Sequence, residues 1–208
     1  LWRPAKAADV LRFFSDGLCL PDVDPPLGDD DEAEPAAGVP FKLVRCWPFI
    51  VGSLYGWYKS KGDRRRFRVA YVETAKGSAK TPVGAGLALH ALVVDGGSGA
   101  QIYTAAVTEK QAKLAYVDAE AMVKKSPELR ARVTITTNNL AVLSTGAFLR
   151  PVSSEARSLD GKRVHFACVD ELHEHPTSEV VDKIRAGTKG RKNALIFEPT
   201  NSGYNRTS

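Results

Sequence analysis

The sequence of 208 residues has no long hydrophobic run and no segment with the pattern of a secretion signal. No window approaches the roughly 18 consecutive apolar residues that a membrane-spanning helix requires. The N-terminus, Leu1-Trp2-Arg3-Pro4, lacks the charged and apolar regions of a signal peptide. These absences predict a soluble, cytoplasmic protein that has no membrane partner.

Cysteine is scarce, and neither sign of charge is in large excess. Cys19, Cys46 and Cys168 are odd in number and far apart, which argues against a disulfide framework and suits a reducing compartment. The net charge of +5 (29 basic minus 24 acidic residues) permits a polyanionic partner without requiring one. Hydrophobic residues at 43% and charged residues at 25% exclude intrinsic disorder, and the length suits one α/β domain.

The N-terminal part of the chain differs in composition from the rest. Residues 4–15 are predicted to form a helix, whereas residues 21–40 are rich in Pro, Gly and acids and predict a solvated loop without a catalytic role. We therefore divide the chain into an N-terminal helix with an acidic loop (1–40) and a main domain (41–208). Because the chain does not begin with Met and stops abruptly, we expect a piece of a longer protein.

Strand and helix patterns alternate through the main domain. Apolar β-rich runs predict strands, and capped amphipathic runs predict the helices between them. The predicted strands are 67–73, 100–106, 132–137, 140–144, 164–169 and 194–197, and the predicted helices are 82–94, 108–125 and 177–187. Asn138-Asn139 is a plausible hairpin turn between two of these strands. The alternation predicts a mostly parallel central sheet with right-handed crossovers, flanked by helices.

The turn 74–81 lies between a predicted strand and a predicted helix, where backbone amides and the helix dipole can hold a phosphate. Lys80 would reach the β and γ phosphates, and the hydroxyl of Thr81 would bind Mg²⁺. Thr74 and Ala79 stand where the pattern G-x-x-x-x-G-K-[ST] has glycine, so the pattern is not met in full. A surface turn that carries a lysine is the alternative interpretation.

Two carboxylates, Asp170 and Glu171, directly follow the predicted core strand 164–169. Ligands bind at this end of the strands in open α/β sheets, so Asp170 can hold Mg²⁺ and Glu171 can activate a water molecule. Acids that cap a following helix are the alternative. A phosphate loop after the first strand with Asp-Glu about 90 residues later favours a three-layer P-loop NTPase of the additional-strand type, and hydrolysis over phosphoryl transfer.

Further motifs follow one another in a consistent order. They are Phe41-x-Leu43, Trp47-x-Phe49, Leu54-Tyr55-Gly56-Trp57, Arg65-Arg66-Phe67-Arg68, the loop 75–81, Ile102-Tyr103-Thr104-Ala105-Ala106 with Gln111-Ala112, Leu159-Asp160-Gly161, Asp170-Glu171-Leu172-His173 and Pro199-Thr200-Asn201-Ser202-Gly203-Tyr204. With them, residues 41–208 resemble the ATPase domain of tailed-phage large terminase subunits. Such a set is far more specific than any single motif.

This resemblance implies an ATP hydrolase that moves double-stranded DNA into a procapsid, with ATP and Mg²⁺ as cofactors. It implies nucleotide contacts from Ala75, Lys76, Gly77, Ser78, Ala79, Lys80, Thr81, Thr200 and Asn201, metal contacts from Thr81 and Asp170, and catalytic roles for Glu171, Lys80 and Lys76. Arg157 is a candidate arginine finger, and an ordinary loop arginine is its alternative. The implied partners are a portal protein, a small terminase subunit and further copies in a ring, in the host bacterial cytoplasm. The family's nuclease domain would follow and is not in this sequence.

Some residues depart from the family pattern. Pro48 stands where the family commonly has Gln, which puts a base contact from that position in doubt. A Cβ at Ala79 could crowd the phosphate loop, so a nonhydrolytic scaffold with a degenerate loop is one alternative function. A helicase-like nucleic-acid translocase is the other.

Two further groups of residues have a structural explanation as the alternative to a binding role. His165, Cys168, His173 and His175 match no common zinc spacing, so core packing is favoured over metal binding. The basic run 59–68 can contact DNA phosphates, or it can be ordinary surface.

Overall fold

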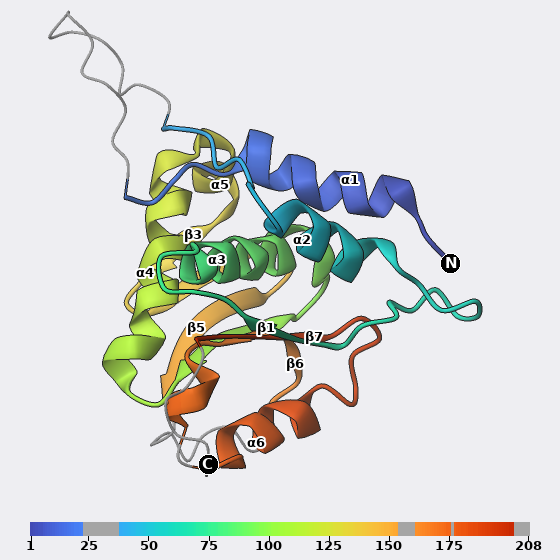
Figure 1. Ribbon diagram of the computed structural model, residues 1–208. Coiled ribbons are helices and arrows are strands. Elements are labelled where there is room, and N and C mark those ends of the chain that lie inside the picture. The colour runs from blue at the N-terminus through green and yellow to red at the C-terminus, as the bar shows by residue number, and fades with distance from the viewer. Residues whose placement is uncertain (23–37, 154–160, 176, 202–208) are drawn as a thin grey trace, which may run out of the picture.

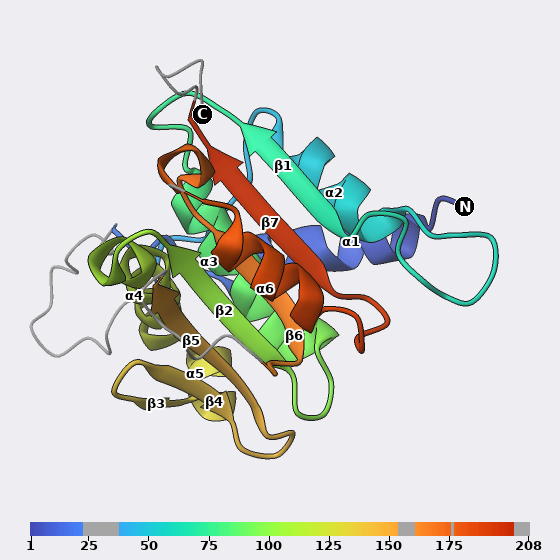
Figure 2. The same ribbon diagram turned by 90° about the horizontal axis from the view of Figure 1, so that it is seen from below.

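The computed structural model describes residues 1–22, 38–153, 161–175 and 177–201. Seven strands form one sheet in the order β1-β7-β6-β2-β5-β4-β3 (Figures 1 and 2). The first five strands in this order run parallel to one another. At one edge of the sheet, β4 pairs antiparallel with both β5 and β3. The strands are β1 (Val69–Glu73), β2 (Gln101–Ala106), β3 (Thr134–Thr136), β4 (Asn139–Val142), β5 (Ala147–Ser153), β6 (Val164–Val169) and β7 (Leu195–Thr200).

Helices cover both faces of the sheet and make the fold three-layered (Figure 1). One face carries α1 (Pro4–Arg12), α2 (Trp47–Gly56), α3 (Lys80–His90), α4 (Glu109–Lys125) and α5 (Pro127–Arg132), and the other carries α6 (Glu179–Gly187). Alternate residues of β6 point to the two layers: Phe166 and Cys168 join the larger core with α3, and Ala167 and Val169 join the smaller core with α6. The predicted α/β class and parallel sheet are confirmed.

The order of the strands matches the additional-strand class. β7 lies between β1, which leads into the loop 74–79, and β6, which ends beside Asp170. Because β1, β7 and β6 are parallel, their carboxyl ends meet at one edge of the sheet. The fold therefore brings together the two segments that were expected to hold a triphosphate.

Helix α3 runs from the end of the loop 74–79 through the centre of the molecule. It is buried nearly along its whole length, and two of its glycines allow close packing on opposite sides. A Cβ on Gly84 would lie 2.6 Å from Sγ of Cys168 in β6, and one on Gly86 would lie 2.4 Å from the ring of Phe14. The residues Ala91–Asp95 continue α3 as a π-helical turn, η2, so one continuous helical segment runs from Lys80 to Asp95.

Several expected boundaries agree closely with the structure. β6 matches the expected strand 164–169, and α4 ends at Lys125 and begins with a capping box between Thr108 and Gln111. The hairpin between β3 and β4 turns at Asn138, whose φ of 53° is in the left-handed region. Helix α3 begins at Lys80, two residues before the expected start at Pro82, because proline is tolerated in the first turn.

Among the α-helices and strands that the structure describes, three were not anticipated. Helix α2 is apolar around most of its circumference and has no amphipathic stripe, so its sequence carries little helical periodicity. Strand β5 contains Pro151, a residue that argues against an interior strand, yet β5 pairs with β2 on one side and β4 on the other. Helix α5 is only one and a half turns long and starts at Pro127 after the cap residue Ser126.

Candidate active site

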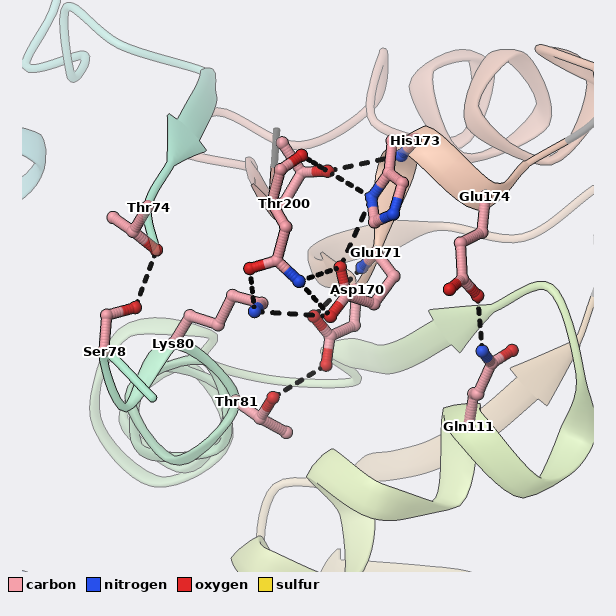
Figure 3. A network of polar contacts seen from close by, with 11 residues as sticks. Thr74, Ser78, Lys80, Thr81, Gln111, Asp170, Glu171, His173, Glu174 and Thr200 are labelled. Atoms are coloured by element: carbon pink, nitrogen blue, oxygen red, sulfur yellow. Dashed lines mark hydrogen bonds and ion pairs between the residues drawn. The ribbon is translucent and has the colours of Figure 1, made fainter. Parts of the chain in front are cut away.

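The candidate site lies at the carboxyl edge of the sheet, where β1, β6 and β7 end side by side (Figure 3). The loop after β1 leads to Lys80 and Thr81 at the start of α3. Asp170 and Glu171 follow β6, and Asn201 follows β7. Figure 3 shows Lys80 and Thr81 pointing toward Asp170 and Glu171 from two separate segments of the chain.

The loop 74–79 is held in shape by contacts within it and from α2. The hydroxyl of Ser78 donates to Oγ1 of Thr74 at 2.7 Å, and Nε1 of Trp47 donates to the carbonyl of Ser78 at 2.7 Å. Gly77 and Ala79 have φ values of 79° and 63°. The left-handed region favours glycine, so Ala79 occupies a position whose backbone explains the glycine of the common motif.

Lys80 is buried in the site, with 7% of its surface exposed. Its Nζ donates to Oδ1 of Asn201 at 2.7 Å and lies 3.3 Å from Oε1 of Glu171. A buried ammonium needs such partners, because desolvation without them is costly. The lysine of the loop and the acid after β6 are therefore in direct contact.

Thr81 and Asp170 form a second contact between the two motifs. The hydroxyl of Thr81 donates to Oδ2 of Asp170 at 2.9 Å, and the backbone N–H of Glu171 donates to Oδ1 of Asp170 at 3.0 Å. Burial raises the pKa of Asp170, and the hydrogen bond from Thr81 opposes that shift. A hydroxyl beside a carboxylate is a set of hard oxygen donors of the kind that Mg²⁺ prefers.

Glu171 has a left-handed backbone, with φ at 48°, and its side chain is held on more than one side. Nδ2 of Asn201 donates to both of its carboxylate oxygens, at 3.0 and 3.1 Å. Nδ1 of His173 lies 3.3 Å from Oε2 of the same carboxylate. Asn201 thus bridges Lys80 and Glu171 with the two ends of its amide.

Polar contacts beyond this bridge involve Thr200, which the sequence marked as a site residue, and His173, Gln111 and Glu174, which it did not. Nδ1 of His173 lies 2.9 Å from Oγ1 of Thr200, and Nε2 of Gln111 donates to Oε2 of Glu174 at 2.5 Å. Thr200 is almost fully buried, with 1% exposed. The signals for His173 and Gln111 were present, since both belong to motifs quoted above, but those motifs assigned them no role.

Not every candidate residue falls in this network. Ala75, Lys76 and Gly77 are exposed on the outer part of the loop. Arg157 lies outside the described residues, as do Ser202, Gly203 and Tyr204 of the last motif.

The His/Cys cluster is divided between separate environments. His165 and Cys168 are buried in β6, and Nε2 of His165 lies 2.8 Å from Oδ2 of Asp95, while His173 contacts Thr200. Within the described ranges, no group of three or more His, Cys, Asp or Glu side chains could hold a metal ion. Core packing explains His165 and Cys168, as favoured.

The chain also matches a known protein family. Residues 47–208 match the family described as terminase large subunit, ATPase domain. The chain belongs to this family. The match covers more than three quarters of the sequence and includes the loop, the acidic pair and Asn201, so the expected family membership is confirmed.

Solved structures of phage terminases share the fold. The large terminase of bacteriophage HK97 matches over 96% of this chain and 38% of its own, with 21% identity and a TM-score of 0.74. The ATPase domain of the Thermus phage P74-26 large terminase matches over 71% of this chain and 67% of its own, with 19% identity and a TM-score of 0.54. The large terminase of a further, thermophilic bacteriophage matches over 72% of this chain and 38% of its own, with 13% identity and a TM-score of 0.51.

The chain thus spans less than two fifths of the HK97 protein. A search of curated proteins gave no match. In the part of the chain that the structure describes, no helix is long and apolar enough to cross a membrane.

Proposed function

We propose that this chain binds and hydrolyses ATP with Mg²⁺ as the motor domain of a terminase large subunit that moves double-stranded DNA into a procapsid. The observation that carries the proposal is the convergence of Lys80 and Thr81 with Asp170 and Glu171, which joins two motifs about 90 residues apart. Membership of the terminase ATPase family supports the same function.

The nucleotide would be held by the loop and the start of α3. Backbone amides of residues 75–81 and the positive end of the helix dipole favour an anion there, and Lys80 supplies a full positive charge. Thr81 and Asp170 would hold Mg²⁺, which neutralises phosphate charge when it is bound. The residues fit the metal, because two oxygen donors from different segments already lie 2.9 Å apart.

Glu171 is the group that would accept a proton from the attacking water. The amide of Asn201 donates to both oxygens of this carboxylate and so fixes its orientation, as a general base requires. Nζ of Lys80 contacts Glu171 and Asn201. If the Lys80 side chain moved to a phosphate oxygen, both residues would lose their contact with it. Asn201 and Thr200 would therefore report the state of the nucleotide to β7 and His173.

The wider role extends beyond this chain. The proposed partners are duplex DNA, a portal protein, a small terminase subunit and further copies in a ring, at the procapsid in the host bacterial cytoplasm. Arg157 would act on the nucleotide of a neighbouring copy. In the proposed organisation, residues 41–208 form the ATPase domain, residues 1–40 precede it, and a nuclease domain lies outside this sequence.

Steady-state ATP hydrolysis tests the proposal. Lys80→Ala and Glu171→Gln should each abolish turnover, because one removes the phosphate charge partner and the other removes the base. Lys124→Ala is a matched control, since Lys124 is exposed on α4 and pairs with Glu120. If both site variants hydrolyse ATP like the parent, the assignments are wrong. If the parent shows neither turnover nor nucleotide-dependent thermal stabilisation, the scaffold alternative is favoured.

A further inference from the structure

Residues 57–66, between α2 and β1, form a short two-stranded hairpin, here called the basic hairpin. Tyr58 and Arg65 form an antiparallel bridge, the N–H of Lys59 donates to the carbonyl of Arg64 at 2.8 Å, and the N–H of Arg66 donates to the carbonyl of Trp57 at 2.8 Å. The hairpin projects from the body of the molecule as the teal loop beyond α2 in Figures 1 and 2.

The exposed residues of the basic hairpin carry more positive than negative charge. Four of its basic side chains are exposed: Lys59, Lys61, Arg64 and Arg66. Its one acid, Asp63, is bound by two cations from other segments, because Arg3 forms an ion pair with it and Nζ of Lys192 lies 3.5 Å from it. The positive charge of the hairpin is therefore not cancelled by its own acid.

The basic hairpin lies at the opposite edge of the sheet from the candidate site. It leads into the start of β1, and the N–H of Arg65 donates to Oδ1 of Asn193, just before the start of β7, at 3.0 Å. Lys80 and Asn201 lie beyond the other ends of the same two strands. A partner on the hairpin would leave the nucleotide edge free.

Arg65 is the one buried cation of the hairpin, with 2% exposed, and it fastens the hairpin to the elements that carry the site. Its Nη2 donates to Oδ2 of Asp95 at 2.8 Å and also to the carbonyl of Asn193, and its guanidinium lies 4.5 Å from the ring centre of Tyr55. Asp95 is the last residue of the helical segment that begins at Lys80. Both α3 and β7 are thus tied to the hairpin at the ends remote from the nucleotide.

We propose that the basic hairpin binds the phosphate backbone of duplex DNA. The inference rests on the proposed function for the identity of the partner, and on the hairpin for the surface. Phosphate contacts require accessible Lys and Arg side chains and supply affinity without apolar burial. Specific protein interfaces need an apolar centre. In the hairpin, the exposed Trp57 lies at the base with its ring 5.4 Å from that of Trp2, and the residues beyond it, 59–64 and 66, are all polar, charged or glycine, which favours DNA over an acidic protein at this end. A two-stranded ribbon also fits the major groove.

The test measures binding of the chain to a fluorescein-labelled 30-bp duplex as a function of salt concentration. One variant removes the four exposed charges of the hairpin, and the control removes four exposed charges from other surfaces. The variant is Lys59→Gln, Lys61→Gln, Arg64→Gln and Arg66→Gln, and the control is Lys6→Gln, Lys110→Gln, Lys124→Gln and Arg130→Gln. Each phosphate contact contributes about 0.9 to the slope of log K against log salt, so the hairpin variant should lower the slope by about 3 to 4. The control should keep most of the parent slope.

The outcomes separate this proposal from the proposed function. Thermal unfolding and DNA-free ATP hydrolysis of the hairpin variant should equal those of the parent, because none of the four side chains is in the site. An unchanged slope, an equal loss in the control, or no duplex binding by the parent would each overturn the hairpin proposal, whatever the hydrolysis assay of Lys80→Ala gives. The same titration with polyglutamate, which stands for an acidic protein, adds one more outcome. If the hairpin variant loses polyglutamate binding but keeps duplex binding, the hairpin proposal is overturned and an acidic protein partner is indicated.

Discussion

Replacement of Arg65 by methionine should destabilise the protein strongly. Removing one partner of a buried ion pair leaves an uncompensated charge and costs about 3 to 5 kcal/mol. Asp95 would keep its contact with His165 at 2.8 Å, and 19% of its side chain is exposed, so we expect the lower end, about 3 kcal/mol. For a domain of this size, that free energy corresponds to a fall in Tm of about 6 to 12 °C.

A double variant separates the charge from the packing. Burial by itself would raise the pKa of Asp95, but the hydrogen bond from His165 and the charge of Arg65 together lower it to about 2, so Asp95 is ionised at neutral pH. Asp95→Asn removes that charge, and Arg65→Met with Asp95→Asn should therefore recover at least about 1 kcal/mol relative to Arg65→Met alone. Urea unfolding at pH 7 measures both values. A loss below about 1 kcal/mol in Arg65→Met, or no recovery in the double variant, would refute the reasoning.

Three further predictions concern Ala79 in the loop 74–79, the buried His90, and Asn201 between Lys80 and Glu171. Ala79→Gly should relieve about 1 kcal/mol of left-handed strain and tighten ATP binding severalfold in titration calorimetry; no gain would count against the steric argument. Burial lowers the pKa of His90 to about 4, so the unfolded chain alone takes up a proton as the pH falls from about 6.5 to 4, and stability should fall by about 3 kcal/mol over that window. His90→Leu should flatten this pH dependence in thermal melts, and an identical pH profile would contradict it. Asn201→Ala should lower kcat at least tenfold with a smaller effect on the Kd for ATP, since Glu171 loses its orienting partner; equal losses in both would indicate a binding role instead.

The sequence predicted the parts of the fold whose local signals agree with their environment. β6 is apolar apart from His165 and buried on both sides, and α4 carries its own capping box, so β6 was found at its observed bounds and α4 to within one residue. α2 and β5 were missed because their stability comes from burial between other elements rather than from periodicity, and Pro151 gave the opposite signal.

The candidate site was predicted in outline and not in its contacts. Lys80, Thr81, Asp170 and Glu171 could be chosen from spacing, because the chemistry of phosphate binding restricts the residue types. That Asn201 bridges Lys80 and Glu171 depends on β7 lying between β1 and β6, which no local pattern fixes. In the same way, the run of arginines at 64–66 does not indicate that the middle one is buried against Asp95, because alternation in a two-stranded hairpin decides it.

The crystal structure of this chain with a nonhydrolysable ATP analogue and Mg²⁺ tests the central claim most directly. The account predicts that the triphosphate lies against the amides of residues 75–81, that Mg²⁺ contacts Thr81 and Asp170, and that Nζ of Lys80 leaves Asn201 for a phosphate oxygen. A nucleotide bound elsewhere, or a Lys80 that keeps its bond to Asn201 beside a bound triphosphate, would contradict it.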